Sequence, residues 1–226
     1  MELNADFAVR AAVHDADNPW RASPMAGVER KMLDRIGDEV ARATSIVRYA
    51  PGNSFSPHIH GGGEEFLVLD GVFQDEHGDY PAGSYVRNPP GTSHTPGSAP
   101  GCTILVKLWQ FDPDDLTQIR YQTEFPDFIA DPERPGVSVQ TLFSSELEDV
   151  AHERWTADTE LTLSTDGGAE IYVVEGEFAE AGETFTAGSW LRLPDGYEAV
   201  IKTGSAPVKV WRKTGHLRDI RVPEAS

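Results

Sequence analysis

The chain has 226 residues, of which 39% are hydrophobic and 25% are charged, a composition typical of globular proteins. Acidic residues outnumber basic ones by 37 to 19 and give a formal net charge of −18, which repels phosphate groups and argues against binding to nucleic acid or to an anionic membrane surface. The single cysteine, Cys102, excludes an internal disulfide and any zinc site built from several cysteines.

The N-terminal stretch, MELNADFAVRAAVHDADNPW, contains acidic side chains early and no long apolar run. It therefore predicts neither a signal peptide nor a membrane anchor. No later segment approaches the length that spans a bilayer. We expect a cytoplasmic protein that does not bind membranes.

Strand patterns dominate the rest of the chain, from ARATSIVRYA through EEFLVLDGVF and CTILVKLWQF to EIYVVEGEF and PVKVWRK. These segments are short, rich in β-branched and aromatic residues, and bounded by Gly, Pro or Asp, as is typical of strands. Only short stretches such as SSELEDVAHERW resemble helices, and weakly. The sequence predicts an all-β protein.

The chain contains an internal repeat. The segment EFLVLDGVFQDEHGDYPAGSYVRNPPGTSH begins at Glu65 and aligns without a gap with EIYVVEGEFAEAGETFTAGSWLRLPDGYEA, which begins at Glu170, an offset of 105 (170 − 65). Turn residues recur at the same places, as in the Ala-Gly-Ser triplets of both copies. We expect two copies of one β-domain, with an N-terminal arm and the first copy in residues 1–125 and the second in residues 126–226.

The first copy contains a candidate metal site in PHIHGGGEEF. His58 and His60 are two residues apart, so on a strand their imidazoles point to the same face. The three glycines that follow allow the chain to bend, so that Glu64 or Glu65 can reach the same point. The turn PPGTSH could return His94 to the same sheet. Three imidazoles and one carboxylate suit a divalent transition metal such as Zn, Fe, Mn, Ni or Co.

The second copy lacks all four candidate ligands. The offset of 105 pairs each of them with a residue of the second copy: His58 with Leu163, His60 with Thr165, Glu64 with Ala169, and His94 with Ala199. These four replacements cannot jointly hold a metal. A solvated His-x-His pair on a loop is the alternative for the first two residues alone, but the loss of all four together indicates that they act as one group.

These residues also carry a resemblance. The segment PGNSFSPHIHGGGEEFLVLDG resembles the first motif of the cupin superfamily, G-x5-H-x-H-x3-E-x6-G, and GSYVRNPPGTSH resembles the second, G-x5-P-x-G-x2-H. The resemblance implies two tandem small β-barrels of the jelly-roll type, a bicupin. It implies one metal in the N-terminal barrel, held by His58, His60, Glu64 and His94. It favours Glu64 over Glu65, which is expected either on the outer face of the barrel or behind the ligands as a supporting carboxylate.

Within that superfamily, GGGEEFLVLDGVFQDEHGDYPAGSYVRNPPGTSHTP is similar to the cupin module of ChrR-type anti-sigma factors. In that family the module binds zinc and takes part in the response to singlet oxygen, so the resemblance implies zinc here. The sigma-binding part of the family is a separate N-terminal helical domain. Residues 1–45 of this chain have no helical-bundle pattern, so the anti-sigma function is not carried over.

Three functions remain open from the sequence. The first is a metal-dependent sensor or binding protein, with zinc and a small-ligand or oxidant-responsive site. The second is an enzyme, an iron(II)-dependent dioxygenase of a small enolisable or phenolic compound. In the third, the metal only stabilises the barrel. Cupins often associate through their sheets, so the resemblance also allows a homodimer.

Other residues are interpreted more simply. Cys102 lies in a predicted buried strand and is expected to be a packed thiol rather than an oxidisable sulfur beside the metal. The remaining histidines are expected at the surface: His14, His77, His152 and His216. Strand registers, which the sequence does not fix, decide which of four further residues line the first barrel: Arg48, Tyr85, Lys107 and Trp109.

Overall fold

The computed structural model describes residues 1–38, 40–122 and 124–223. Within these ranges the chain forms 24 strands, one short 3-10 helix and no α-helix, so the all-β prediction is confirmed. The described part of the chain contains no helix with the length and apolar character needed to cross a bilayer. The helical interpretation of SSELEDVAHERW is wrong. Strand β17 (Asp149–Trp155) occupies it, because pairing with strands on both sides and burial of Val150 and Trp155 outweigh its weak helical pattern.

The chain divides into two compact units. The first unit contains Met1–Ala5, the described residues from Pro19 to Glu124, and the described residues after Ile220. The second contains Asp6–Asn18 and Phe125–Ile220. The N-terminal arm is therefore divided between them, and its strand β2 (Ala11–Val13) completes a sheet of the second unit by pairing with β22.

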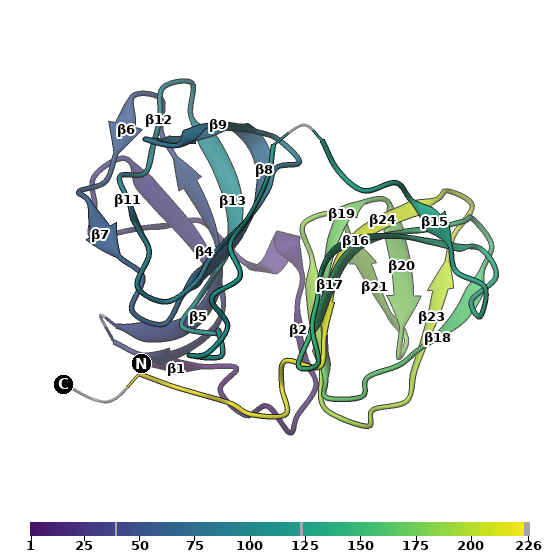
Figure 1. Cartoon of the computed structure of the whole chain (residues 1–226). Helices are drawn as coiled ribbons and strands as arrows, with labels where there is room; N and C mark the ends of the chain where they lie inside the picture. Colours follow the sequence, from purple (N-terminus) through teal and green to yellow (C-terminus); the bar gives the residue numbers. More distant parts are fainter. Residues whose placement is uncertain (39, 123, 224–226) are drawn as a thin grey trace. The chain divides into compact units, whose positions relative to one another are not determined.

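The first unit contains thirteen of the strands in the described residues: β1 (Glu2–Leu3), β3 (Arg21–Ala22), β4 (Val28–Gly37), β5 (Ala41–Tyr49), β6 (Asn53–Ser54), β7 (His58–Ile59), β8 (Glu64–Asp75), β9 (Gly78–Pro81), β10 (Tyr85–Asn88), β11 (Ser93–His94), β12 (Gly97–Ser98), β13 (Cys102–Leu108) and β14 (Ile119–Tyr121). Its larger sheet has the order β1-β4-β5-β13-β8-β10-β14. Strand β8 continues beyond this sheet, and its last residues pair with β9 and β12. Figure 1 shows the short strands β6, β7, β11 and β12 together at one side of this unit.

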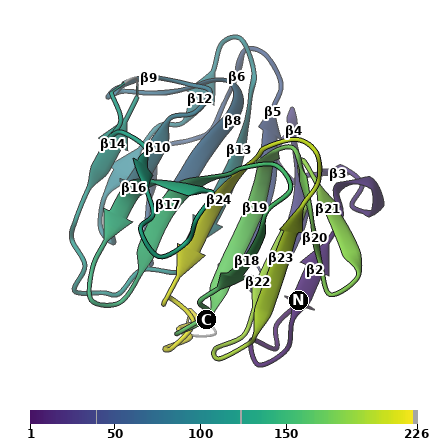
Figure 2. The same cartoon turned by 90° about the vertical axis from the view of Figure 1, so that its right-hand side faces the viewer.

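The second unit contains β2, the 3-10 helix η1 (Asp15–Asp17) and ten further strands: β15 (Ile129–Ala130), β16 (Val137–Ser144), β17 (Asp149–Trp155), β18 (Glu160–Leu163), β19 (Ala169–Glu175), β20 (Glu177–Glu180), β21 (Glu183–Thr186), β22 (Trp190–Leu193), β23 (Ala199–Thr203) and β24 (Val208–Thr214). Its two sheets have the orders β15-β16-β17-β24-β19-β22-β2 and β18-β23-β20-β21. Figure 2 shows β16, β17, β24 and β19 side by side.

Both units are antiparallel jelly-roll barrels, and the repeat of the sequence reappears in their strands. Strands β10 and β22 begin at Tyr85 and Trp190, an offset of 105 (190 − 85). The interiors differ. The second barrel is filled by a continuous apolar core that includes Trp155, Phe178 and Phe185. The apolar core of the first barrel is smaller, and polar side chains occupy part of its interior.

Candidate metal centre

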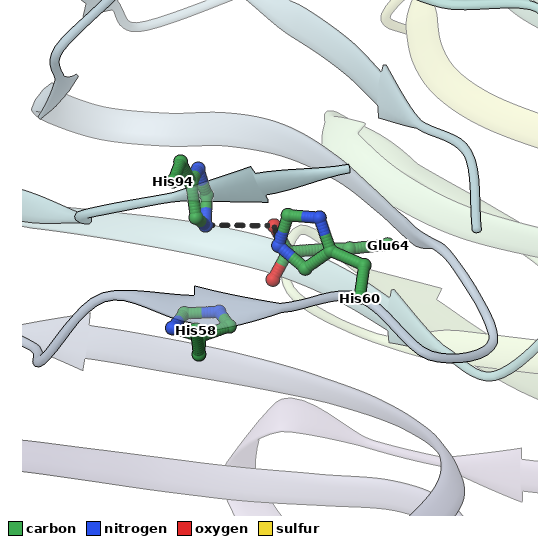
Figure 3. Close-up of side chains that lie close together, drawn as sticks. All are labelled: His58, His60, Glu64 and His94. Atoms are coloured by element: carbon green, nitrogen blue, oxygen red, sulfur yellow. Dashed lines mark ion pairs between the residues drawn. The ribbon is translucent and has the colours of Figure 1, made fainter. Parts of the chain in front are cut away.

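The four predicted ligands come from the short strands β7 and β11 and from the start of the long strand β8, and they converge on one point. His58 begins β7, His60 follows that strand, Glu64 begins β8, and His94 ends β11. Strands β7 and β11 pair with His94 directly opposite His58. Figure 3 shows the three imidazoles and the carboxylate turned toward one another. One ligand atom from each residue lies within 4.8 Å of the others.

Three of these residues present buried polar atoms that have no hydrogen-bond partner: Nε2 of His60, Nε2 of His94 and Oε2 of Glu64. The carboxylate oxygen is 3.4 Å from the His60 nitrogen and 3.3 Å from the His94 nitrogen. His58 is exposed, so it forms the solvent side of the cluster. A buried polar atom left without a partner costs about 1–3 kcal/mol. A cation held between these atoms would satisfy all of them at once, so the donor set fits a divalent transition metal.

Hydrogen bonds behind the cluster fix the imidazole tautomers. Nδ1 of His60 is 2.9 Å from Oγ1 of Thr92, and the hydroxyl of Thr92 donates to the carbonyl of Pro89 at 2.7 Å. The threonine oxygen must therefore accept a hydrogen bond from the N–H of Nδ1, which leaves the lone pair of His60 on Nε2.

The other two imidazoles follow the same rule. Nδ1 of His94 is 3.2 Å from Oδ2 of Asp75, and Nδ1 of His58 is 3.2 Å from the carbonyl oxygen of Ser56. Both partners are acceptors, so Nδ1 carries the proton and Nε2 carries the lone pair in each ring. This is the arrangement of metal-binding histidines, whose second nitrogen donates to a carboxylate or carbonyl.

Burial controls the charges of the cluster. It lowers the pKa of His60 to about 3, aided by the nearby His94 and His58, so this imidazole is neutral at pH 7. Burial raises the pKa of Glu64. Burial alone would lower the pKa of His94. The hydrogen bond that this imidazole donates to Asp75 and the charge of Glu64 outweigh burial and raise the pKa. The pKa shifts thus keep His60 neutral and favour the protonated forms of His94 and Glu64, so a bound cation would displace protons from these two residues.

The three glycines between His60 and Glu64 have two roles. Gly63 has φ +78°, a left-handed conformation that lets the chain turn into β8, as the sequence predicted. Gly61 and Gly62 instead allow a close approach. A Cβ on either would lie 2.8 Å or 2.3 Å from the ring of Trp109. The indole therefore packs directly on the backbone that positions the ligands.

A cavity of about 310 Å³ lies inside the first barrel, and its lining includes His58, His60 and Glu64. The sequence left open which of Arg48, Tyr85, Lys107 and Trp109 point into the first barrel. Of these four residues, Trp109 lines the cavity. The other three point elsewhere. Arg48 is exposed and pairs with Glu29, and Lys107 donates to Thr44. Tyr85 donates to Glu65 at 2.6 Å.

Several expectations about other residues are settled by their burial. Cys102 is buried in the apolar core, as expected of a packed thiol. His77 is exposed. The surface interpretation is wrong for His152, which is buried with its Nδ1 3.0 Å from Oε1 of Gln140. It is also wrong for His216, whose side chain is buried with its Nε2 3.0 Å from Oε1 of Glu170. Each has a polar partner from another part of the chain, which its local sequence does not reveal.

The equivalent place in the second unit is apolar. Leu163, Ala169 and Ala199 are all buried in its core. Thr165, at the position of His60, donates its hydroxyl to the carbonyl of Tyr197 at 2.6 Å. Among the described residues, these four therefore offer no set of metal ligands.

Sequence reasoning missed the two residues that orient the imidazoles. Thr92 lies inside the PPGTSH turn, two residues before His94. A hydroxyl in such a turn could have been identified from the sequence as a hydrogen-bond partner for a ligand, because turn hydroxyls bond to nearby groups. Asp75 ends β8 and reaches His94 only through the fold. Its acidic neighbours Glu76 and Asp79 make it indistinguishable from a solvated turn residue in the sequence.

Residues 8–112 match the profile of the ChrR cupin-like domain family. No curated protein matches the sequence at a significant level. The chain is therefore similar to that family over its first barrel and the preceding arm.

Solved structures resemble the whole chain. A candidate dioxygenase from Nostoc punctiforme has a TM-score of 0.74 at 13% identity, covering 97% of this chain and 87% of that chain. A candidate glyoxylate-induced protein from Pseudomonas aeruginosa gives 0.67 at 12% identity, with 96% and 91% covered. A variant of oxalate decarboxylase from Bacillus subtilis gives 0.59 at 14% identity, with 91% and 77% covered. At these identities the likeness shows the fold alone.

Proposed function

We propose that this chain, for which the profile match and the fold support the cupin superfamily, is a bicupin that binds one divalent transition metal in its first barrel and a small organic ligand beside that metal. The residues that would hold the metal are His58, His60, Glu64 and His94. One observation carries the proposal: in all three imidazoles Nδ1 faces an acceptor, so every Nε2 lone pair is free to ligate.

The cavity supports the second half of the proposal. A metal that only stabilises a barrel needs no open space beside it, and structural metal sites are closed. Here three of the four candidate ligands line a cavity of about 310 Å³, within the size range of small-molecule sites. A divalent metal supplies Lewis acidity, and iron(II) adds redox chemistry with dioxygen. The residues of the chain orient the donors, and the apolar side chains of the cavity provide a surface for the ligand.

Zinc is the first expectation for the metal and iron(II) the alternative, because three imidazoles and a carboxylate suit both. The profile match supports a relationship to the ChrR cupin module. An oxidant-responsive role would act at the metal cluster itself. Cys102 is a poor sensor, since burial raises the pKa of its thiol to about 11 and keeps it protonated.

The second candidate function is an iron(II)-dependent dioxygenase of a small enolisable or phenolic compound. The same cavity favours it, because catalysis needs a substrate held next to the metal. The Nostoc punctiforme structure was described as a candidate dioxygenase, and its fold likeness makes this reaction class a reasonable one to test.

Metal content tests the proposal. Protein purified without a histidine tag should hold about one equivalent of zinc or iron, and His60→Ala should hold almost none. His77→Ala is the matched control, because His77 is an exposed turn histidine of the same unit, and it should bind like wild type. Equal metal in wild type and His60→Ala would refute the site.

Oxygen uptake separates the two functions. Iron(II)-loaded protein that consumes oxygen with a member of a panel of diketones and phenols would favour the dioxygenase. Bound zinc and no oxygen consumption would favour the binding protein. A purely structural metal predicts a third result, in which metal removal unfolds the first barrel and no small molecule binds.

A further inference from the structure

The cavity of the first barrel has largely apolar walls and two arginines, and Glu64 of the metal cluster also lines it. Its lining includes six apolar or aromatic side chains grouped around the interior: Val47, Tyr49, Phe55, Ile104, Val106 and Trp109. Arg30 and Arg35 of β4 line the same cavity. In a chain with 37 acidic and 19 basic residues, two guanidinium groups in an apolar cavity require an explanation.

A β-bulge turns the second arginine inward. Val47 and Ala43 of β5 both line the cavity, and their partners on β4 are Arg30 and Arg35. The register between β4 and β5 shifts between Met32 and Asp34. Residues opposite each other in a ladder share a face, and an extra residue in one strand reverses which side chains face inward.

Without this shift, the pairing of Arg30 with Val47 would place Asp34 opposite Ala43 (30 + 47 = 34 + 43). The bulge places Arg35 there instead. The carboxylate of Asp34 then lies on the other face, where it accepts a hydrogen bond from the backbone N–H of Thr44 at 2.8 Å. One inserted residue therefore exchanges a negative charge for a positive one in the cavity wall.

Among the residues that the structure describes, no carboxylate pairs with Arg30, while the exposed carboxylate of Asp38 lies near Arg35 but pairs with the N-terminal amine. Arg30 donates from Nη2 to the hydroxyl of Ser23, and its buried Nε has no hydrogen-bond partner. Arg35 donates to the backbone carbonyls of Gly37 and Asp38. Burial and the nearby charge of Arg30 lower the pKa of Arg35, so the two cations repel each other in a half-buried place.

We propose that the cavity binds a small organic carboxylate, with the carboxylate between Arg30 and Arg35 and the apolar body against the aliphatic and aromatic wall. Guanidinium groups bind carboxylates through paired hydrogen bonds, and an anion here would neutralise the repulsion between them. The volume of about 310 Å³ equals about ten water molecules of liquid, which limits the ligand to a short chain or a single ring. The binding of the carboxylate by the two arginines does not depend on the proposed function. Only the placement of the other end of the ligand beside the metal rests on it.

Calorimetric titration of the full chain with hexanoate tests this inference, before and after removal of metal with a chelator. Wild type should bind hexanoate, and Arg30→Gln and Arg35→Gln should each weaken binding at least tenfold. Arg30→Lys keeps the charge but loses the planar fork, so its affinity should be intermediate. The matched control is Arg48→Gln, since Arg48 lies on the next strand with its side chain exposed and outside the cavity. It should bind hexanoate like wild type.

Two further ligands test the two halves of the proposed ligand. Hexanamide has the same apolar body without the charge, and it should bind at least tenfold more weakly than hexanoate. Inorganic phosphate has the charge without the apolar body, and it should not compete. Thermal unfolding accompanies each variant. A ligand-binding role predicts that Arg35→Gln is about as stable as wild type, because relief of the repulsion from Arg30 offsets the loss of the hydrogen bonds to the carbonyls of Gly37 and Asp38.

The outcomes separate this inference from the proposed function. Wild-type hexanoate binding that depends on both arginines supports the inference, even in protein that holds no metal. Normal metal content with no carboxylate binding would overturn the inference and leave the metal site intact. Equal hexanoate affinity in wild type and in both glutamine variants would also overturn it.

Discussion

Ala199 lies directly opposite Leu163 between β23 and β18 of the second unit, in the register in which His94 lies opposite His58 in the first. Both members of the apolar pair are buried in the core of their barrel. The same strand pairing therefore forms with or without imidazoles. Because the fold does not require the polar residues of the first unit, their convergence supports a role in binding.

The hydrogen bond behind His60 is expected to control metal affinity. In Thr92→Val the shape is kept, but Nδ1 of His60 loses its acceptor and its buried proton is left unsatisfied. Mutation of a residue that hydrogen-bonds a metal-binding histidine typically lowers metal affinity 10–100-fold, and we expect a loss in that range. Titration with zinc against a competing chelator measures it. Thr95→Val, an exposed threonine in the next turn, is the control and should leave affinity unchanged. Unchanged affinity in Thr92→Val would contradict the tautomer assignment.

Asp75→Asn tests the corresponding contact of His94. The amide can still accept a hydrogen bond, but it loses the negative charge that raises the pKa of His94. We expect weaker metal binding by about tenfold, in the range for residues that orient a metal-bound histidine. Folding should be retained, and far-ultraviolet circular dichroism checks it. An affinity equal to that of wild type would indicate that Asp75 does not orient the imidazole.

Gly62→Ala should destabilise the first unit by steric contact alone. Its backbone is not in the left-handed region, and a Cβ would lie 2.3 Å from ring carbons of Trp109. Overpacking of this kind typically costs about 1–3 kcal/mol. Urea unfolding measures the loss. Gly204→Ala is the control, because the nearest atom to its Cβ, Oε1 of Glu177, is 4.0 Å away. Equal stability of Gly62→Ala and wild type would show that the indole is free to move away.

The thiol of Cys102 should not react in the folded protein. Burial raises its pKa to about 11, so almost no thiolate exists at pH 8. A thiol reagent such as Ellman's reagent should modify it only as the chain unfolds, with complete reaction in urea as the control. Cys102→Ala should keep the metal content of wild type. Immediate labelling of native protein would revive a cysteine-based response to oxidants.

The second unit should lose stability in acid because of His152. Burial, followed by the charges of Lys209 and Arg154, lowers the pKa of this imidazole from 6.5 to about 3. Between these values the unfolded chain binds a proton that the folded chain does not, so stability falls as the pH falls from about 6.5 toward 3.

The size of this effect is measurable by urea unfolding at pH 7 and pH 5. His152 should contribute a loss of roughly 2 kcal/mol over this interval. His152→Gln cannot take up the proton, and its loss should be smaller by about that amount. His77→Gln, at an exposed turn, should follow wild type. If the free energy of unfolding of His152→Gln depends on pH as that of wild type does, the buried imidazole does not cause the loss of stability in acid.

The sequence predicted the fold class and the candidate ligands because both depend on local patterns. Short β-branched segments between turn residues identify strands, and the alignment of Glu65 with Glu170 identifies the repeat. The spacing of His58, His60 and Glu64 reflects a local turn, and such spacings are visible in one chain.

Features set by contacts between distant segments were not predictable. The first two glycines of the GGG triplet are required by Trp109, 47 residues after Gly62 (109 − 62). The inward direction of Arg35 depends on a bulge within β4, and no residue type in VERKMLDRIG marks its position. His152 is buried because β17 lies between two strands, and its acidic and basic neighbours suggested the surface.

The most direct test of the metal site transfers the residues of the second copy into the first. The variant combines His58→Leu, His60→Thr, Glu64→Ala and His94→Ala, the residues with which the second barrel folds. Metal content by plasma mass spectrometry, after loading with zinc or iron(II) and dialysis, should be about one equivalent in wild type and near zero in the variant. Circular dichroism should be the same for both. A folded variant that holds as much metal as wild type, or a wild type that holds none, would contradict the account.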